Sequence, residues 1–371
     1  MTVKTRVCEI LEIEHPIVLA GMGGASTPEL AAAVSNAGGL GVLGAAGCGP
    51  RQLREWINRT RELTDKPFGV DTLLPASVRR ASFGDSEGPA PQDLLPEMKE
   101  FAREFMAKQG LERIDRGSVT RPDPDGPPMF TKEFFDAQMD VVIEERVPVY
   151  ASGLGNPGPW MERLRANGTK VLAVVGKVKH AIQVKSSGLD IIVAQGHDGG
   201  GHNSPIGTLA LIPQVVDASG DTPVLGAGGI TDGRGIAAAM VLGAEGAWVG
   251  SAFLVAEESG ILDFQKQAIV DAAEEDTVVS KTVTGKPARV IRSLWTDTWA
   301  RDGRETLPMP FQGMVSGPVM AAANRDGRGD INPGFAGQGI GMIKAVRPAA
   351  EIFDELVWGL DQALQRSSNW L

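Results

Sequence analysis

Short apolar segments alternate with amphipathic, alanine-rich segments along most of this 371-residue chain. Eight of the apolar segments have the length and composition of strands. They are Pro16–Ala20, Leu40–Gly44, Phe68–Leu74, Val147–Ser152, Lys170–Val175, Ile191–Gln195, Thr222–Gly228 and Gly246–Ser251. Continuous apolar runs of this kind are typical of parallel strands that are buried on both faces.

The segments between the strands have helical patterns. Thr27–Ala37, Thr131–Arg146 and Asp232–Leu242 each begin with a residue that caps helices well. Eight strands that alternate with helices predict an α/β fold in which the sheet closes into a TIM (β/α)8 barrel. An open, doubly wound sheet is the alternative.

Two segments do not follow this alternation of strands and helices. The first, about 76–130, follows the third strand and contains a helical stripe of Leu94, Met98, Phe101 and Phe105, so we expect a lid insertion there. The second, 260–343, predicts a small, mainly helical second domain on the substrate side. The barrel is then expected over residues 1–259, and segment 344–371 supplies a C-terminal helix, Arg347–Leu364, that packs back on the barrel.

Composition and charge narrow the class of protein. With 42% hydrophobic and 22% charged residues the chain has a globular composition, and its formal net charge of −10 argues against nucleic acid or anionic lipid as a partner. No segment approaches the roughly 18 apolar residues of a membrane span. Glu9, Glu12 and Glu14 interrupt any secretory pattern, which predicts a cytoplasmic protein. The spacing of Cys8 and Cys48 does not match that of a metal site. The sequence leaves the oligomeric state open, with a homo-oligomer as one alternative.

Glycines concentrate where the predicted strands end. In a parallel barrel these ends share one face, and the loops that follow them build the active site. After the seventh and eighth strands, "GAGGITDGRG" and "VGSAF" place free N–H groups at helix starts, which suits a phosphate group. We therefore expect a phosphorylated cofactor. The glycines after the first strand do not complete the dinucleotide fingerprint G-x-G-x-x-G.

The loop "AQGHDGGGHN", residues 194–203, carries two of the four histidines. A metal site of His197, Asp198 and His202 is disfavoured, because the two histidines are five residues apart and no further ligand is nearby. A nucleophilic serine is also disfavoured, because G-x-S-x-G is absent. Three successive glycines let the backbone lie against a flat ligand, and a histidine at the end of the loop is then suited to accept a proton.

Several of these motifs together resemble the nitronate monooxygenase family, formerly called 2-nitropropane dioxygenases. They are "PIVLAGMGGASTPELAAAVSNAGGLGVLG", "SGLGNP", "AQGHDGGGH", "TPVLGAGGITDGRGIAAAMVLGAEGAWVGSAF" and "PGFAGQGIGMI". The resemblance implies an FMN-containing barrel related to flavin-dependent enoyl-acyl-carrier-protein reductases and NADH:quinone reductases. It aligns Asp198 with a glutamate of the family and His202 with its catalytic histidine, and it implies no metal.

The resemblance also implies which residues contact FMN. The turn after the first strand and Gln195 would lie beside the ring, the glycines after the last two strands would hold the phosphate, and "AGQG" would return from the C-terminal segment. The residues so assigned are Ala20, Gly21, Met22, Asp71, Gln195, Gly200, Gly201, Gly228, Gly229, Gly250, Ser251, Gln338 and Gly339.

The chain departs from the family pattern at two positions. Asp71 stands where the family usually has asparagine, and a carboxylate there would oppose negative charge on the reduced flavin unless it is paired or protonated. Ala252 replaces the arginine of "GTRF", whereas Ser251 keeps a hydroxyl.

The function implied is oxidation of alkyl nitronates or nitroalkanes with O2. The alternative is an acyl-CoA or enoyl reductase or dehydrogenase that uses NAD(P)H, as in steroid-ring or fatty-acid catabolism. Its basic rim would come from Arg79, Arg80, Arg113, Arg116, Arg289 and Arg292.

Overall fold

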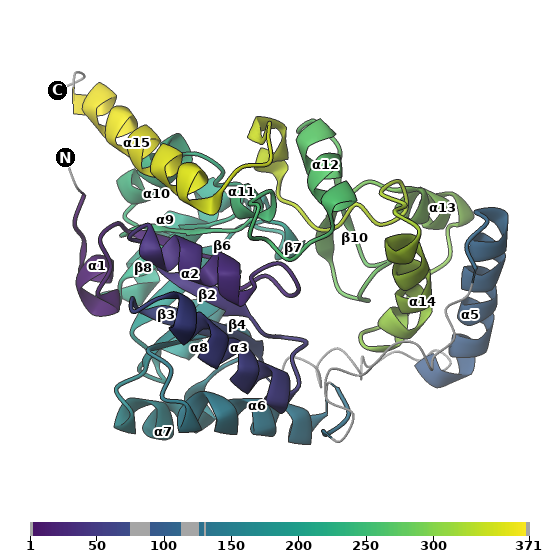
Figure 1. The fold of residues 1–371 in the computed structure, drawn as a ribbon, viewed down its shortest axis with the longest axis horizontal. Coiled ribbons are helices and arrows are strands. Elements are labelled where there is room, and N and C mark those ends of the chain that lie inside the picture. The colour runs from purple at the N-terminus through teal and green to yellow at the C-terminus, as the bar shows by residue number, and fades with distance from the viewer. Residues whose placement is uncertain (1–2, 75–89, 113–125, 130, 369–371) are drawn as a thin grey trace.

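The structure, a computed structural model, describes residues 3–74, 90–112, 126–129 and 131–368. Its centre is a sheet of eight parallel strands in the order β1-β9-β8-β6-β5-β4-β3-β2 (Figure 1). The strands are β1 (Ile17–Leu19), β2 (Gly41–Gly44), β3 (Phe68–Leu73), β4 (Val149–Leu154), β5 (Lys170–Val175), β6 (Ile191–Gln195), β8 (Val224–Ala227) and β9 (Ala247–Val249). A parallel bridge between Val18 and Leu40 joins the first strand to the last in this order. The sheet is therefore closed, which confirms the predicted TIM barrel and excludes the open sheet.

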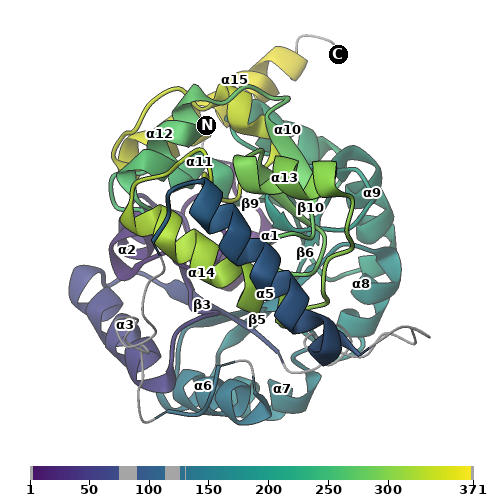
Figure 2. The same ribbon diagram turned by 90° about the vertical axis from the view of Figure 1, so that its right-hand side faces the viewer.

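Helices form a ring around the barrel (Figure 2). They are α2 (Pro28–Asn36), α3 (Pro50–Leu63), α6 (Lys132–Glu144), α7 (Met161–Ala166), α8 (Val178–Lys185), α9 (Thr208–Ser219), α10 (Gly233–Val241) and α15 (Ala349–Ser368). The side chains of Thr27, Thr131 and Asp232 accept hydrogen bonds from the first turns of α2, α6 and α10, as their sequence positions predict. Helix α15 packs against α10 and α2 of this ring.

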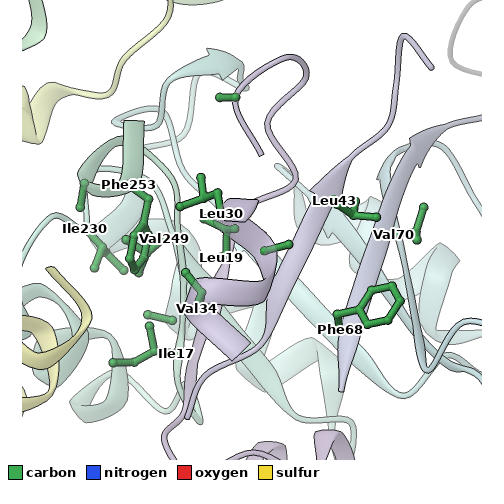
Figure 3. Packing of buried hydrophobic residues seen from close by; sticks show 14 of the residues in the cluster. Ile17, Leu19, Leu30, Val34, Leu43, Phe68, Val70, Ile230, Val249 and Phe253 are labelled. Atoms are coloured by element: carbon green, nitrogen blue, oxygen red, sulfur yellow. The ribbon is translucent and has the colours of Figure 1, made fainter. Parts of the chain in front are cut away.

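Both faces of the barrel sheet are buried. Outward-facing side chains such as Leu19, Leu43 and Val249 pack against the helix ring, as Figure 3 shows. A second cluster includes Val18 and Trp248 together with residues of α1 (Arg6–Leu11), which lies at the end of the barrel away from the glycine turns. This double burial is the physical reason why the strands have continuous apolar sequences.

A second lobe covers the other end of the barrel (Figures 1 and 2). It comprises α12 (Asp263–Asp271), β10 (Thr277–Ser280), β11 (Ala288–Ile291), α13 (Leu294–Asp302), α14 (Phe311–Arg325), η2 (Gln338–Met342) and α5 (Pro91–Lys108). The sequence pattern predicts a mainly helical region here, and it gives no sign of β10 and β11, which form an antiparallel sheet with β7 (Gly201–His202).

Helix α5 belongs to the core of the second lobe. Its predicted stripe is buried at Met98, Phe101 and Phe105, and the rings of Phe101 and Phe105 lie 6.0 and 5.0 Å from that of Trp295 in α13. The described part of the predicted lid is thus a structural member of this lobe. Residues 75–89, 113–125 and 130 of that segment lie outside the described residues.

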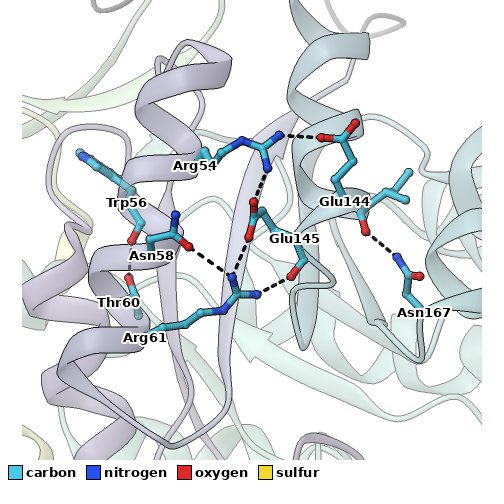
Figure 4. A network of polar contacts seen from close by, with 9 residues as sticks. Arg54, Trp56, Asn58, Thr60, Arg61, Glu144, Glu145 and Asn167 are labelled. Atoms are coloured by element: carbon cyan, nitrogen blue, oxygen red, sulfur yellow. Dashed lines mark hydrogen bonds and ion pairs between the residues drawn. The ribbon is translucent and has the colours of Figure 1, made fainter.

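An ion-pair network fixes α6, which follows the insertion, against α3 (Figure 4). Arg54 pairs with Glu144 at 2.6 Å and also with Glu145, and Arg61 pairs with Glu145 at 2.7 Å. Burial alone would raise the pKa of Glu145, but the hydrogen bonds from Arg61 and Arg54 outweigh it and lower that pKa. In the described parts of the chain, no helix is both long and apolar enough to span a membrane.

Candidate functional site at the barrel mouth

The parallel strands bring most of the predicted site residues to one end of the barrel. Ala20, Gly21 and Met22 follow β1, Asp71 lies near the end of β3, and Gln195 ends β6. The glycine turns after β8 and β9 open at the same end. Residues that are more than 200 positions apart in the sequence therefore lie together at the mouth of the barrel.

The turn after β1 approaches its neighbours closely. The Ser26 hydroxyl donates to the Ala20 carbonyl at 2.8 Å and accepts from the Met22 N–H at 3.1 Å, which holds the turn in shape. A Cβ atom on Gly21 would lie 2.2 Å from Cβ of Asp71, a distance that non-bonded carbon atoms do not adopt. Glycine at this position is therefore required by the Asp71 side chain.

Asp71 is a buried carboxyl group without a cationic partner among the described residues. It is 6% exposed, and its Oδ1 accepts one hydrogen bond, from the Gly153 N–H at 2.9 Å. Burial raises the pKa of Asp71 well above its usual value, and the Gly153 hydrogen bond opposes that shift only in part. The carboxyl group thus favours its neutral form.

The turns after β8 and β9 offer backbone donors to the mouth. Gly228 and Gly229 have φ angles of 102° and 74°, a conformation that side chains disfavour, so both positions require glycine. Their N–H groups and that of Gly250 donate to no other group in the described chain. The Thr208 hydroxyl fixes the first turn by donating to the Gly228 carbonyl at 3.0 Å. Free N–H groups at such turns suit a phosphate.

The segment around η2 returns from the second lobe to these turns. The Gln338 N–H donates to the Asp198 carbonyl at 2.8 Å, and the Gly337 N–H donates to the Ser251 hydroxyl oxygen at 2.9 Å. The Ser251 hydroxyl proton stays available as a donor. A Cβ on Gly200 would lie 2.8 Å from the backbone of Ala336, so this glycine allows the close approach of the two segments.

A cavity of about 370 Å³ lies beside the turn after β8. It extends from the turn after β8 into the groove between α9 and α10. The predicted residues that line it are Gly228, Gly229, Gln338 and Gly339, and Asp198 lines it as well.

The first half of the loop after β6 has a structural role. Nδ1 of His197 lies 2.9 Å from the Ser204 carbonyl oxygen. Asp198 accepts the Thr208 N–H at 3.0 Å through Oδ2, so its carboxylate stabilises the start of α9. Both side chains are used to hold the loop against the barrel. The described residues contain no group of three or more His, Cys, Asp or Glu side chains arranged to hold a metal ion.

His202 ends this loop and lies in β7, where it joins the sheet of the second lobe. The Gln195 side chain donates to its carbonyl at 3.0 Å. Nε2 of the ring lies 2.9 Å from Oγ1 of Thr284, in the turn between β10 and β11. Burial first, and the charge of Lys286 second, lower the pKa of His202 to about 4. The imidazole is therefore neutral at pH 7.

Thr284 and Lys286 were missed by the sequence analysis. The signal that would have found them is the turn sequence "TGKP" between two short strand-like segments. Arg289 was assigned wrongly to a basic rim. It is 3% exposed, and its guanidinium donates to the His197 carbonyl and to Thr277. Arg292 is exposed, and the other four arginines of that rim lie outside the described residues.

Comparison with known proteins identifies the class. The barrel, its mouth and the similarities below define a flavin-dependent oxidoreductase. The chain belongs to the nitronate monooxygenase family, whose sequence profile matches residues 4–359. A Staphylococcus aureus (strain JH9) protein described as a probable nitronate monooxygenase is 32% identical over 373 residues, which cover 98% of this chain and 99% of that protein.

Two solved structures are similar over nearly the whole chain. Nitroalkane oxidase from Streptomyces ansochromogenes is 30% identical with a TM-score of 0.81, and the match covers 98% of this chain and 99% of that one. FabK from Thermotoga maritima is 32% identical with a TM-score of 0.74, and the match covers 100% of both chains.

Proposed function

We propose that this protein is an FMN-dependent monooxygenase that oxidises alkyl nitronates or nitroalkanes with O2. The family membership and the similarity to nitroalkane oxidase support the reaction class. The observation that carries the proposal is the position of a neutral histidine, His202, beside a mouth lined by unpaired backbone donors.

The residues at the mouth fit an FMN group. The N–H groups of Gly228, Gly229 and Gly250 are unused by the described chain, and the Ser251 hydroxyl has a proton to donate. These residues would hold the phosphate. Ala20, Gly21, Met22, Gln195, Gly200, Gly201, Gln338 and Gly339 would line the rest of the site. FMN would supply the two-electron redox chemistry and its reoxidation by O2.

The side chains at the mouth of the barrel would bind protons and set the local charge. Neutral His202 accepts or orients a proton at the carbon next to the nitro group. Burial raises the pKa of Asp71, which favours the protonated carboxyl group, so the departure from asparagine in the family pattern opposes electron uptake at the mouth less than an ordinary aspartate would. The second lobe carries the β10–β11 turn that contacts His202.

A visible spectrum and an oxygen electrode test this function. The purified protein should show flavin absorption bands, release FMN on denaturation, and consume O2 with propionate 3-nitronate in the absence of NADH. A protein that stays colourless after incubation with FMN would contradict the cofactor. A flavoprotein that consumes no O2 with nitronates or nitroalkanes would contradict the substrate class.

A second candidate function is supported by the similarity to FabK. It is the reduction of an enoyl or acyl-CoA thioester by NAD(P)H. The buried position of Arg289 removes one residue of the basic rim on which a CoA substrate would depend. Anaerobic, stoichiometric oxidation of NADH by an enoyl-CoA would favour this candidate over the first.

A further inference from the structure

Two regions of the chain position His202 at the mouth of the barrel. The loop that carries it starts in the barrel at β6, but Gly201 and His202 pair antiparallel with Arg289 and Ala288 of β11 in the second lobe. The ring then reaches Oγ1 of Thr284, which is 82 residues away in sequence. The orientation of the imidazole therefore depends on the second lobe.

The turn that carries Thr284 is held firmly by the helices of that lobe. The Thr282 carbonyl accepts from Nε1 of Trp295 at 3.1 Å and from Nε2 of Gln312 at 2.8 Å. The Val283 carbonyl accepts from the Ser316 hydroxyl at 2.6 Å. These donors are side chains of α13 and α14, so two helices of the second lobe hold in place the turn that carries the Thr284 hydroxyl.

The hydrogen bonds around Oγ1 of Thr284 distinguish the two neutral forms of His202. The Lys286 N–H donates to Oγ1 at 3.2 Å, and the Lys286 carbonyl lies 3.3 Å away as an acceptor for the hydroxyl proton. If Nε2 of His202 carries the proton, it donates to Oγ1 and the hydroxyl donates to the Lys286 carbonyl. If Nδ1 carries it, the hydroxyl donates to Nε2 and that carbonyl loses this donor. The first arrangement makes one more hydrogen bond.

We propose that Thr284 is a positioning residue that holds His202 in the Nε2–H form, so that Nδ1 is the atom that accepts a proton from substrate. This inference rests on the proposed role of His202 as the base. Nδ1 makes no hydrogen bond to any residue that the structure describes. When the substrate C–H bond breaks, its proton forms a bond with Nδ1 and the electron pair stays on the substrate as a nitronate.

The charged groups near the ring are compatible with this role. From the β10–β11 turn, Lys286 faces the imidazole and lowers its pKa. Arg289 lies on the adjacent strand β11, but its guanidinium is directed to the His197 carbonyl and Thr277. Once His202 is protonated, Nε2 still donates to Thr284, whose own proton still bonds the Lys286 carbonyl. The hydroxyl therefore supports the ring before and after proton transfer.

Nitrogen NMR on protein labelled with ¹⁵N-histidine tests the form of the ring without any turnover. Only four histidines contribute signals, and His202→Asn assigns the one of interest. At pH 7 the wild type should show a protonated Nε2 and an unprotonated Nδ1. In Thr284→Val both shifts should move toward the average of exchanging forms, whereas Thr284→Ser should restore the wild-type pattern. A wild-type signal with the proton on Nδ1 would overturn the proposal.

Kinetics supply the second measurement. Removal of an orienting partner should lower kcat of Thr284→Val about tenfold, a part of the ~10²–10⁴-fold that a positioned base contributes, with little change in KM. Thr284→Ser should recover most of this loss. An unaltered kcat and unaltered shifts in Thr284→Val would reject the inference. If instead the wild type has the expected ring form but oxidises no nitronate, the proposed function fails while the positioning by Thr284 stands.

Discussion

The glycine turns after β8 and β9 and the cluster around His202 lie at the same end of the barrel, but they are constructed in opposite ways. The turns present backbone N–H groups, fixed by local φ angles and by one hydrogen bond from Thr208. The His202 cluster consists of side chains from one small sheet and its β10–β11 turn, at positions 82 residues apart in the sequence. The first is shaped by the backbone of the barrel turns themselves, with the η2 segment beside them, whereas the second exists only where the two lobes pack together.

This difference predicts separate roles for the two regions, cofactor binding for the turns and proton transfer for the His202 cluster. Backbone donors recognise any phosphate at a helix start, so the turns fix a cofactor class and say little about substrate. In the proposed function, the histidine, its hydroxyl partner and the nearby Lys286 would decide which protons move and at what pH. Cofactor retention and turnover should therefore respond to different mutations, and the predictions below test that separation.

Removal of the imidazole should produce the largest effect on turnover. We expect His202→Asn to lower kcat/KM for a nitroalkane, whose C–H proton the imidazole accepts, by ~10²–10⁴-fold, the usual contribution of a positioned acid–base group. Flavin content should remain unchanged, because the described residues of the turns after β8 and β9 make no hydrogen bond to this ring. His180→Asn, on α8 outside the barrel, is the matched control. Parallel loss of flavin and activity would show that the two regions are not separable.

Loosening the second lobe should damage turnover more than cofactor retention. Trp295 is fully buried, packs on Phe101, Phe105 and Trp299, and anchors the Thr282 carbonyl. Trp295→Ala should lower the free energy of unfolding by about 3–5 kcal/mol. It should also reduce kcat through the turn that carries Thr284.

The matched control for this change is Trp358→Ala. Trp358 lies on α15 with 66% of its surface exposed, so its removal should leave stability nearly unaltered. Urea unfolding followed by tryptophan emission measures the stability of the chain, and flavin fluorescence followed in the same titration measures release of the cofactor. A Trp295→Ala protein with wild-type kcat would show that the lobe does not orient His202.

The two regions also differ in how far the sequence predicts them. The eight barrel strands are apolar throughout because both faces of the sheet are buried. The glycine turns follow these strands directly, so the sequence predicts that the turns lie at the carboxyl end of the barrel. The cluster around His202 has no such local pattern. Strands β10 and β11 have four residues each, and β11 contains the buried Arg289, whose charge pointed to a solvent-exposed rim.

Long-range packing explains the remaining errors. The stripe of α5 predicted an apolar face, but nothing near it in sequence identifies Trp295 and Trp299 as its partners. Similarly, the contact between His202 and Thr284 follows from β7–β11 pairing, and β7 has only two residues. A strand so short gives no periodicity from which to predict its partner.

An added methyl group at the phosphate turn should affect the cofactor first. Gly229 has φ of 74°, and its Cβ would lie 2.9 Å from Cβ of Asp198. Gly229→Ala should cost about 1–2 kcal/mol in backbone strain, which corresponds to roughly tenfold weaker FMN binding if the turn relaxes away from the phosphate. Flavin titration of the apoprotein measures it. Gly207→Ala is the control, because a Cβ there meets nothing within 4 Å. Equal affinity in both variants would remove the turn from the FMN site.

Asp71 lies near the carboxyl end of β3, beside Gly21 and Gly153, and its substitution should give the smallest effect, visible only as a dependence on pH. The folded protein holds the Asp71 proton to higher pH than the unfolded chain, in which the carboxyl group titrates near 3.8. Folding therefore binds a proton in the window between these two pKa values, and stability declines as pH rises through that window. Asp71→Asn keeps an oxygen for the Gly153 N–H and never ionises, so it lacks this decline.

The difference in Tm between Asp71→Asn and wild type should thus be near zero at acid pH and should grow in favour of the variant as pH rises. Thermal unfolding from pH 4 to 9 measures it, with the exposed Asp65→Asn as a control that shifts no such curve. A variant that is less stable than the wild type at pH 8 would mean that the Asp71 carboxylate is ionised and stabilised there. In that case a negative charge sits at the end of β3, and the mouth disfavours rather than accommodates a reduced, anionic flavin.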